Sequence, residues 1–136
     1  MQHLEIEPTY RSPHVIFNPE EGLFKIEGNS ILVNVEEFYN PLLEWMDEFV
    51  KQKSDGKIEI VFDIEHTNLA SAKRLVFFLY RIKELVDKGV EVEVCWRYNS
   101  NDNDAFELGQ DFAQVLELPI NFLRYEKLKK REIWAH

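Results

Sequence analysis

The sequence predicts an α/β fold in which a mostly parallel sheet begins with an antiparallel hairpin. Two observations predict it. Short β-branched apolar runs alternate along the chain with longer segments whose apolar residues recur at steps of three and four, as strands and amphipathic helices do. Near the N-terminus, the apolar runs 15–17 and 23–26 are instead joined by Asn18–Gly22, which has hairpin-turn chemistry, and Gly28–Ser30 is expected to end the hairpin. Because strands that alternate with helices form parallel sheets, the expected order is β-β-α-β-α-β-α-β.

A helix is expected after this hairpin. Its apolar residues recur at helical spacing and predict one core-facing stripe, made of Phe38, Leu42, Trp45, Met46 and Phe49. Pro41 fits this helix in two ways. It lies in the first turn after an Asn40 cap, or it kinks a longer helix that begins near Val35.

The central unit of the chain is Lys57–Lys88, which reads as a strand, a turn and a long helix. The strand, Ile58–Ile64, is apolar enough to be covered on both faces. A polar turn at 65–68 then brings the chain out at the carboxyl end of the strand, where α/β sheets usually meet their ligands. Asn68 is the predicted N-cap of the helix, and Gly89 is the predicted stop.

The C-terminal part repeats the strand–helix alternation. Val90–Tyr98 alternates strictly at first, which predicts a strand with one apolar face: Val90, Val92, Val94 and Trp96. A polar loop at 99–104 leads into a helix at Asp104–Leu116, which Pro119 ends. A last strand is expected at Ile120–Tyr125.

Composition limits the class of protein. With 136 residues, 45% of them hydrophobic, we expect one domain at 1–126 followed by a basic tail at 127–136. The formal net charge of −9 argues against general binding of nucleic acid and against adsorption to anionic membranes. A single cysteine, Cys95, excludes an internal disulfide framework and fits a reducing compartment. Since the chain has neither a long apolar span nor the order of a signal peptide, we expect a cytoplasmic protein.

Motifs for cofactors and metals do not appear. The five glycines form neither a dinucleotide fingerprint nor a P-loop, so no cofactor is predicted. The segment Asn99–Asp104 resembles a calcium loop, but Asp104 stands where glycine is required and Gln110 where glutamate is required. We therefore interpret it as a solvated loop and helix cap, and predict no metal. Cys95, in the middle of a strand, is interpreted as inert packing.

Polar residues at the end of the central strand support an alternative function. Asp63, Glu65, His66 and Thr67 cluster in sequence, and strand alternation places Asp63 and Glu65 together with His66 opposite. No second histidine or cysteine lies at ligand spacing nearby. Together with the loop at 99–104, these residues would suit a small ligand-binding domain or a hydrolase if a deep pocket joined them.

The central helix favours a different function, the binding of a partner protein. At 100° per residue, its predicted core face consists of Ala72, Leu75, Val76, Leu79, Ile82 and Val86. Nearly opposite lie Ala70, Lys73, Arg74, Phe77 and Arg81. This pattern puts a phenylalanine on a basic, outward face of an acidic protein, as partner-binding faces often do. The other interpretation is a second contact within the chain that covers Phe77.

Several motifs together resemble a known family. They are Pro13–Gly28, Glu37–Trp45, Asn68–Lys73, Val94–Tyr98, Glu107–Phe112 and Leu118–Pro119. Over residues 4–126 the chain resembles the SiaC-like regulatory phosphoproteins of bacteria, whose fold resembles that of STAS domains. The resemblance implies a switch protein without enzymatic activity. A dedicated kinase and phosphatase control the phosphorylation of such proteins, and the unmodified form binds and activates a diguanylate cyclase.

The resemblance also implies a phosphorylation site, with one departure. The family's acceptor is the threonine of an Asn-Thr-Ser-Ser-x-Lys motif, of which three positions match here, namely Asn68, Ser71 and Lys73. Leu69 replaces the acceptor threonine, and Ala70 replaces the first serine. The nearby hydroxyls, Thr67 and Ser71, are the candidate phosphorylation sites. Three outcomes remain open: the switch has moved to one of them, the protein is permanently unphosphorylated, or the partner has changed.

The sequence therefore predicts a non-catalytic regulator of bacterial signalling. We expect it to dock a diguanylate cyclase, or the kinase or phosphatase of the same module, through the turn and helix at 66–81. The predicted partner-binding residues are Asn68, Leu69, Lys73, Arg74, Phe77 and Arg81.

Overall fold

The computed structural model describes residues 1–126, so the predicted basic tail at 127–136 lies outside the described residues. The strands are β1 (Leu4–Ile6), β2 (His14–Asn18), β3 (Leu23–Ser30), β4 (Lys57–Thr67), β5 (Glu91–Asn99) and β6 (Asn121–Tyr125). The helices are α1 (Val35–Gln52), α2 (Leu69–Asp87) and α3 (Asn103–Leu116). The strands form one sheet in the order β1-β2-β3-β4-β5-β6, antiparallel up to β3 and parallel from β3 onward. The predicted α/β fold with an N-terminal antiparallel hairpin is confirmed.

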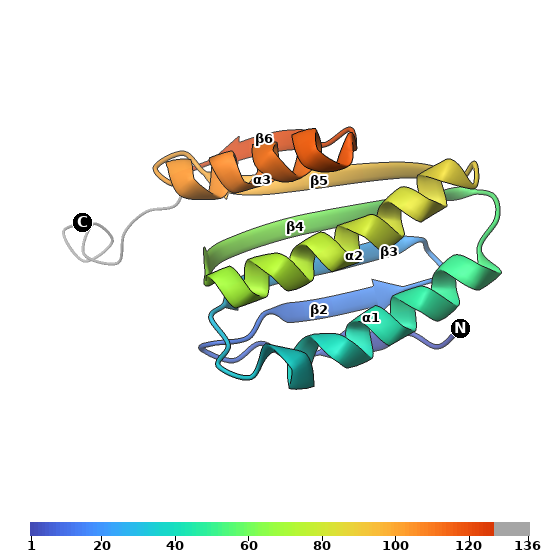
Figure 1. Cartoon of the computed structure of the whole chain (residues 1–136), viewed down its shortest axis with the longest axis horizontal. Helices are drawn as coiled ribbons and strands as arrows, with labels where there is room; N and C mark the ends of the chain where they lie inside the picture. The colour runs from blue at the N-terminus through green and yellow to red at the C-terminus, as the bar shows by residue number, and fades with distance from the viewer. Residues whose placement is uncertain (127–136) are drawn as a thin grey trace.

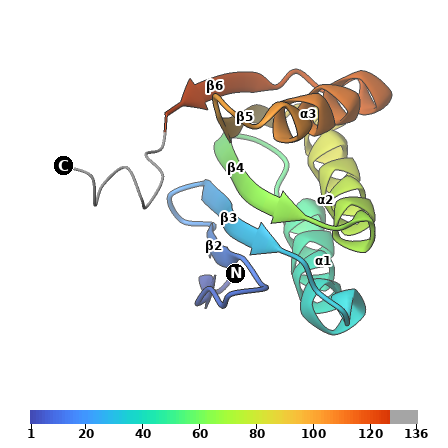
Figure 2. The same ribbon diagram turned by 90° about the vertical axis from the view of Figure 1, so that its left-hand side faces the viewer.

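All three helices lie on the same face of the sheet (Figures 1 and 2). The parallel strands follow one another in space and each crossover has the same hand, so every connecting helix arrives on the same side. The prediction that the central strand is covered on both faces is therefore only partly confirmed for the described residues, because no described helix lies on the second face although Val61 is buried there. Ile58, Ile60 and Phe62 of β4 are buried under the helices, whereas Glu59 is exposed and Asp63 is only partly buried on the other face.

The central strand is longer than the sequence indicated. Residues 65–67, predicted as a turn, are the last residues of β4. They remain in the sheet because β3 also continues past Gly28, with a register shift, so that Ser30 pairs with Thr67. Only Asn68 is left between β4 and α2, which places the start of this helix directly at the end of the strand.

The two possibilities for the first helix are resolved in favour of the longer one. α1 begins at Val35, and the Asn34 side chain accepts a hydrogen bond from the Glu37 amide. Pro41 therefore lies inside the helix rather than at its start. For α2 the predicted cap is confirmed, since Asn68 accepts from the Ser71 amide at 2.9 Å.

The buried face of α2 is rotated about the helix axis relative to the predicted one. Phe78 and Leu85, which were left out of the predicted core face, are fully buried, whereas Val76 and Val86 are only partly buried. The physical reason is that α2 is the middle helix, with α1 on one side and α3 on the other (Figure 1). Contacts with these two helices, as well as with the sheet, therefore determine which side chains of α2 are buried.

Candidate functional site

The candidate site begins at Asn68, which joins two segments that are distant in the sequence. One end of its side-chain amide caps α2, and its Nδ2 atom donates to the Leu32 carbonyl at 2.9 Å. These two bonds fix the first turn of α2 against the loop that precedes α1. Leu69, the next residue, projects from this rigid turn with 74% of its surface exposed.

The two candidate phosphorylation sites differ in accessibility. Ser71 is completely buried, and its hydroxyl has no hydrogen-bond partner among the described residues. Thr67 is partly buried, and its hydroxyl donates to the Asn68 carbonyl at 3.3 Å. Because a kinase must reach the hydroxyl that it modifies, this geometry favours Thr67 over Ser71 as an acceptor. The sequence did not reveal this difference, because the buried face of α2 is rotated relative to its apolar pattern and includes Ser71.

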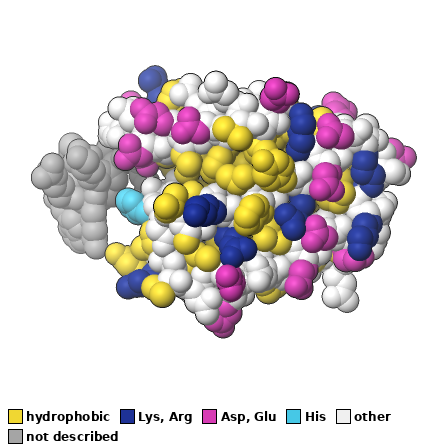
Figure 3. Space-filling view, viewed as in Figure 1, with side chains coloured by type: hydrophobic (Ala, Val, Ile, Leu, Met, Phe, Trp, Pro, Cys, Tyr) yellow, Lys and Arg dark blue, Asp and Glu magenta, His cyan; other side chains and the backbone are white. Residues whose placement is uncertain are grey.

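The outward face of α2 carries an apolar ridge that includes basic side chains. Leu69, Lys73 and Phe77 are exposed along it, with Phe77 at 42%. Tyr80, also exposed, extends the same ridge and was missed, although its position three residues after Phe77 is a helical-face signal. Figure 3 shows hydrophobic and basic side chains together in the middle of this face, with acidic side chains mostly around them.

The two arginines beside the ridge are held by α1. The Nε atom of Arg81 donates to Asp47 at 2.8 Å, and its Nη1 atom donates to the Phe77 carbonyl at 2.8 Å. Arg74 forms an ion pair with Glu36 at 3.3 Å, and its guanidinium lies 5.7 Å from the centre of the Phe77 ring. Both arginines are therefore engaged within the chain, where they support Phe77, and Lys73 is the more accessible cation of the ridge.

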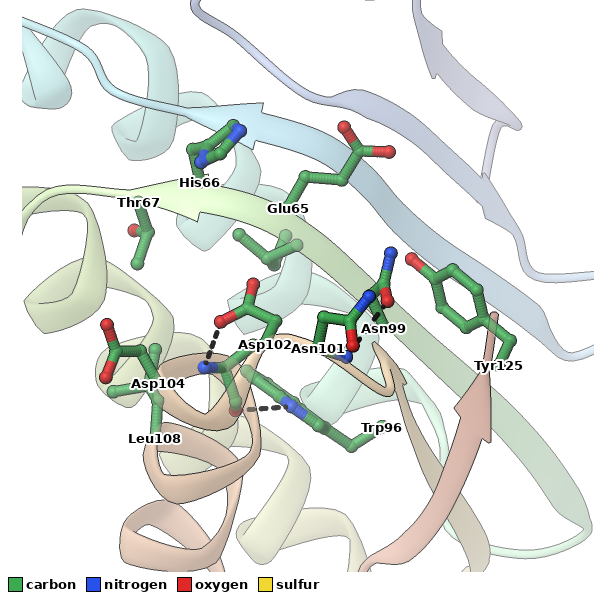
Figure 4. A pocket seen from close by; sticks show the side chains of 12 residues that line it. Glu65, His66, Thr67, Trp96, Asn99, Asn101, Asp102, Asp104, Leu108 and Tyr125 are labelled. Carbon is green, nitrogen blue, oxygen red and sulfur yellow. Dashed lines mark hydrogen bonds between the residues drawn. The ribbon is translucent and has the colours of Figure 1, made fainter. Parts of the chain in front are cut away.

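A cavity of about 540 Å³ lies at the carboxyl ends of β4 and β5, beside the start of α3 (Figure 4). It brings residues 65–67 together with the loop at 99–104, as the alternative function required. Trp96 and Leu108 contribute apolar surface to it. The loop at 99–104 also caps a helix as predicted, because Asp102 accepts from the Ala105 amide at 3.0 Å.

Asp63, the remaining member of the predicted acidic cluster, does not line this cavity. It lies on the face of the sheet opposite the helices, where it accepts a 2.8 Å hydrogen bond from the Tyr125 hydroxyl and forms an ion pair with Arg97 at 3.6 Å. Burial raises the pKa of Asp63, and the hydrogen bond from Tyr125 opposes this effect. Within residues 1–126, no hydrogen bond links His66 to a carboxylate or hydroxyl, so no nucleophile–base pair is assembled at the cavity.

One group of side chains has the spacing of metal ligands, at the β1–β2 edge of the sheet. Ligand atoms of Glu5, Glu7 and His14 lie within 4.8 Å of one another. His14 already bonds to Glu5 at 2.9 Å, and the carboxylates are exposed. This group could not be predicted from the sequence, because it depends on the pairing of β1 with β2. Cys95 is buried, and burial raises its pKa, which keeps the thiol protonated.

The fold and the site together are those of a small α/β protein that presents a helix start and an apolar helix face to its surroundings. A family profile described as "SiaC family regulatory phosphoprotein" matches residues 6–125, which places the chain in the class of regulatory phosphoproteins. The chain belongs to the SiaC family. The resemblance inferred from its motifs is confirmed.

Similar proteins agree with this assignment. A curated but uncharacterised protein of Pseudomonas aeruginosa strain UCBPP-PA14 is 23% identical over 121 residues, which cover 88% of this chain and 94% of the relative. The solved structure of P. aeruginosa SiaC has a TM-score of 0.82 at 21% identity and covers 92% of this chain and 100% of its own. SiaC has also been solved in complex with the diguanylate cyclase SiaD, of which it is described as the activator; that structure covers 90% of this chain and 99% of its own, with a TM-score of 0.82 at 20% identity. At these identities the structural similarity shows the shared fold.

Among the described helices, none is both long enough and apolar enough to cross a membrane.

Proposed function

We propose that this protein is a non-catalytic cytoplasmic regulator that binds a partner protein through residues 66–81. The partner is a diguanylate cyclase, or the kinase or phosphatase of the same signalling module. The observation that carries the proposal is the exposed ridge of Leu69 and Phe77 on the helix at which the family motif lies. The activation of SiaD by the related SiaC supports the choice of a cyclase.

The energetics of the ridge suit a docking surface. Aromatic side chains held in place by their neighbours are the typical anchors of protein interfaces, because little rotamer entropy is lost when a partner covers them. Phe77 is held in this way by Arg74 and by the bond from Arg81 to its own carbonyl. Leu69 adds an apolar contact at the helix start, and Lys73 lies between the two.

Leucine at the family's acceptor position gives the proposal a further feature. Leu69 cannot take a phosphate, so the surface around it keeps the charge and shape of an unmodified helix start. We propose that this protein is permanently in the binding-competent form, and that its activity is set by abundance rather than by phosphorylation.

Calorimetric titration of the purified candidate cyclase from the source organism tests the docking surface. The variants Phe77→Ala and Arg81→Glu are expected to weaken binding by at least tenfold, about 1.4 kcal/mol each. Leu123→Ala is the matched control, because Leu123 is an exposed apolar residue that lies far from the outward face of α2. It pairs with Arg97 of β5, and both side chains lie on the sheet face away from the helices. Unchanged binding by both α2 variants would remove this surface from consideration.

The cavity beside α3 supports a second candidate, a small-ligand-binding domain that uses residues 65–67 and 99–104. Its volume lies within the range of pockets that hold small molecules. Binding of a metabolite at the cavity, with Phe77→Ala leaving every protein contact unchanged, would favour this candidate over docking.

A further inference from the structure

We propose that the basic tail, residues 127–136, folds back across the face of the sheet on which no described helix lies. The tail lies outside the described residues, and the family profile ends before it, at residue 125. Because α2 lies on the other face of the sheet, this inference does not depend on the docking of a partner there. It follows from the composition of the open face, the charge of the tail and the place where the chain leaves β6.

The open face is the side of the sheet that carries Val61, Cys95 and Leu123. All three helices lie on the other side (Figure 2). Val61 of β4 and Cys95 of β5 are paired neighbours in the middle of this face, and both are buried. Leu123 of β6 is 54% exposed on the same side. The open face therefore offers apolar surface at which a further segment of chain can pack.

Acidic side chains outnumber basic ones on the open face. From β3 to β5 the acidic side chains are Glu27, Glu59, Asp63, Glu91 and Glu93, and the basic ones are Lys25, Lys57 and Arg97. Each basic side chain forms an ion pair with one carboxylate, at 3.6 to 3.9 Å. Within residues 1–126, these pairs leave Glu59 without an ion pair. The open face therefore attracts further positive charge.

Two pairs of carboxylates are direct neighbours on adjacent strands of the open face. Glu27 of β3 pairs with Asp63 of β4, and Glu59 of β4 pairs with Glu93 of β5. Like charges at neighbouring positions of a sheet repel each other. A cationic segment that lies over these pairs would reduce the repulsion, so the sheet itself gains stability when the face is occupied.

The basic tail has the charge and the apolar side chains that this face lacks a partner for. Its basic residues are Lys127, Lys129, Lys130 and Arg131, and its one acidic residue is Glu132. Ile133 and Trp134 follow directly. A second copy of the protein would bring an equally acidic open face, which would be repelled. The tail of the same chain is therefore the occupant that the charges favour.

The end of β6 already brings the chain onto the open face. Tyr125 is the last residue of β6, two residues before the tail begins. Its hydroxyl donates to Asp63 at 2.8 Å, and the Arg97 guanidinium lies 5.1 Å from the centre of its ring. The Tyr125 side chain therefore crosses β5 and contacts β4, so the tail starts beside the surface that it is proposed to cover.

The tail is long enough to reach the carboxylate pairs. Tyr125 pairs with Asn99, and Glu93 lies about 20 Å back along β5 from Asn99. An extended chain covers the same distance, about 20 Å, between Tyr125 and Arg131. Trp134 lies about 30 Å from Tyr125 in an extended chain. Since neighbouring strands are about 4.8 Å apart, this length crosses β5 and β4 and reaches β3.

NMR of the full chain tests the contact directly. We expect nuclear Overhauser effects between the Trp134 indole and methyl groups of the open face, those of Leu23, Val61 or Leu123. None is expected between Trp134 and Phe77 on the outward face of α2. Sodium chloride at about 1 M, where the Debye length is about 3 Å, should weaken the effects to the open face.

Substitutions in the tail check the role of charge. In the triple variant Lys129→Glu, Lys130→Glu and Arg131→Glu, we expect the Overhauser effects to be lost and the amide signals of 59–63 and 93–97 to shift. The matched control is Lys129→Arg, Lys130→Arg and Arg131→Lys, which keeps every charge and should retain the effects. The amide spectra report whether each variant is folded.

Substitutions on the open face check the other side of the contact. Glu59→Gln combined with Glu93→Gln is expected to reduce the intensity of the same Overhauser effects. Glu44→Gln combined with Glu84→Gln is the control, because both residues are exposed on helices and lie away from the open face. This control should leave the intensities unchanged.

Absence of Overhauser effects between Trp134 and the open face would overturn the inference, as would effects that persist in the charge-reversed tail. Effects seen only between differently labelled copies in a mixed sample would place the tail on a second molecule, and would overturn it as well. The docking proposal is tested on α2 with Phe77→Ala, so either proposal can fail while the other stands.

Discussion

At the scale of single residues, Asn68 holds the candidate site together. Its side chain caps α2 and also satisfies the Leu32 carbonyl, so one residue fixes both the helix start and the neighbouring loop. Leu69 follows directly after this cap but contributes little to the packing, since most of its surface is exposed. Substitution of Asn68 should therefore mainly reduce stability, and substitution of Leu69 should mainly change partner binding.

Substitution of Asn68 is expected to reduce stability in two steps. Asn68→Ser keeps a capping oxygen and removes the donor to Leu32, which we expect to cost about 1 kcal/mol. Asn68→Ala removes the cap as well, and we expect a loss of about 2 kcal/mol. Urea denaturation of the two variants and the parent measures both steps. Equal stability of Asn68→Ala and the parent would show that the loop and the helix do not depend on this side chain.

Substitution of Leu69 is expected to change binding without changing stability. Leu69→Asp places a negative charge at the position where the resemblance to the family implies a phosphate, and we expect partner affinity to fall by at least tenfold, about 1.4 kcal/mol. The fold should tolerate it, because a carboxylate at a helix N-terminus meets a favourable dipole. Leu69→Met, which keeps the position apolar, is the matched control. Calorimetry and thermal melting report the two properties separately, and undiminished affinity of Leu69→Asp would contradict the role of this residue.

The carboxyl group of Asp63 should make stability depend on pH. Because burial raises the pKa of Asp63 in the folded state, the folded protein holds this proton more tightly than the unfolded chain. This contribution to the free energy of unfolding therefore falls as the pH rises through the interval above the ordinary pKa of aspartate. Asp63→Asn still accepts from Tyr125 and does not ionise, so its stability relative to the parent should rise across that interval. Denaturation at several pH values checks the trend, and Glu59→Gln, at an exposed position two pleats away on β4, should not show it.

At the scale of elements, the contact between α3 and the sheet depends on the absence of a side chain. A Cβ atom on Gly109 would lie 2.8 Å from two atoms of the Trp96 ring and 2.9 Å from the Phe122 ring. Gly109 lets the helix approach β5 and β6 closely. This contact also orients Trp96, whose indole donates to α3 and lines the cavity.

Gly109→Ala is therefore expected to destabilise the protein although alanine is the better helix former. Overpacking costs about 1–3 kcal/mol, and the gain in helix propensity returns about 1 kcal/mol, so we expect a net loss of up to about 2 kcal/mol. Gln110→Ala, at the neighbouring exposed position, is the control and should have a small effect. Thermal melting followed by tryptophan fluorescence measures both. A Gly109→Ala variant as stable as the parent would mean that Trp96 and Phe122 can move aside.

The elements that the sequence predicted are those with local signals. The cap and stop of α2 depend on Asn68 and Gly89 alone, and both were identified. β1 was missed because three residues without a turn signal gain strand structure only by pairing with β2. The coverage of one sheet face depends on the hand of all the crossovers, and the burial of Ser71 depends on how α2 is rotated against its neighbours. Neither is visible in a single segment.

The candidate site likewise has features that a single segment predicts and features that depend on contacts between distant segments. Helical periodicity was sufficient to predict that Lys73 and Phe77 face outward, because the outward face of a helix follows from its own sequence. The engagement of Arg74 and Arg81 by α1 could not be predicted, since it joins residues that lie more than thirty positions apart. The cavity likewise joins two strand ends whose proximity depends on the order of the sheet.

At the scale of the whole molecule, the features that can bind lie toward one end of the sheet. The start of α2 and the cavity are both at the carboxyl ends of parallel strands, as is usual for the functional regions of α/β proteins. A phosphate in this region would change the charge offered to the ridge and to the cavity together. Whether the chain carries a phosphate therefore decides whether its proposed activity is constant or regulated.

We expect the protein isolated from its native cells to carry no phosphate under any growth condition. The acceptor position is Leu69, Ser71 is buried, and the hydroxyl of Thr67 is engaged with the backbone. Intact-mass measurement should give the mass of the unmodified chain. Leu69→Thr, expressed in the same cells, is the matched comparison, because it restores the family's acceptor at an exposed position and should gain phosphate where the kinase is present. Phosphate located on Thr67 or Ser71 of the parent chain would mean that the switch has moved rather than been lost, and the ridge of α2 would then be a regulated surface.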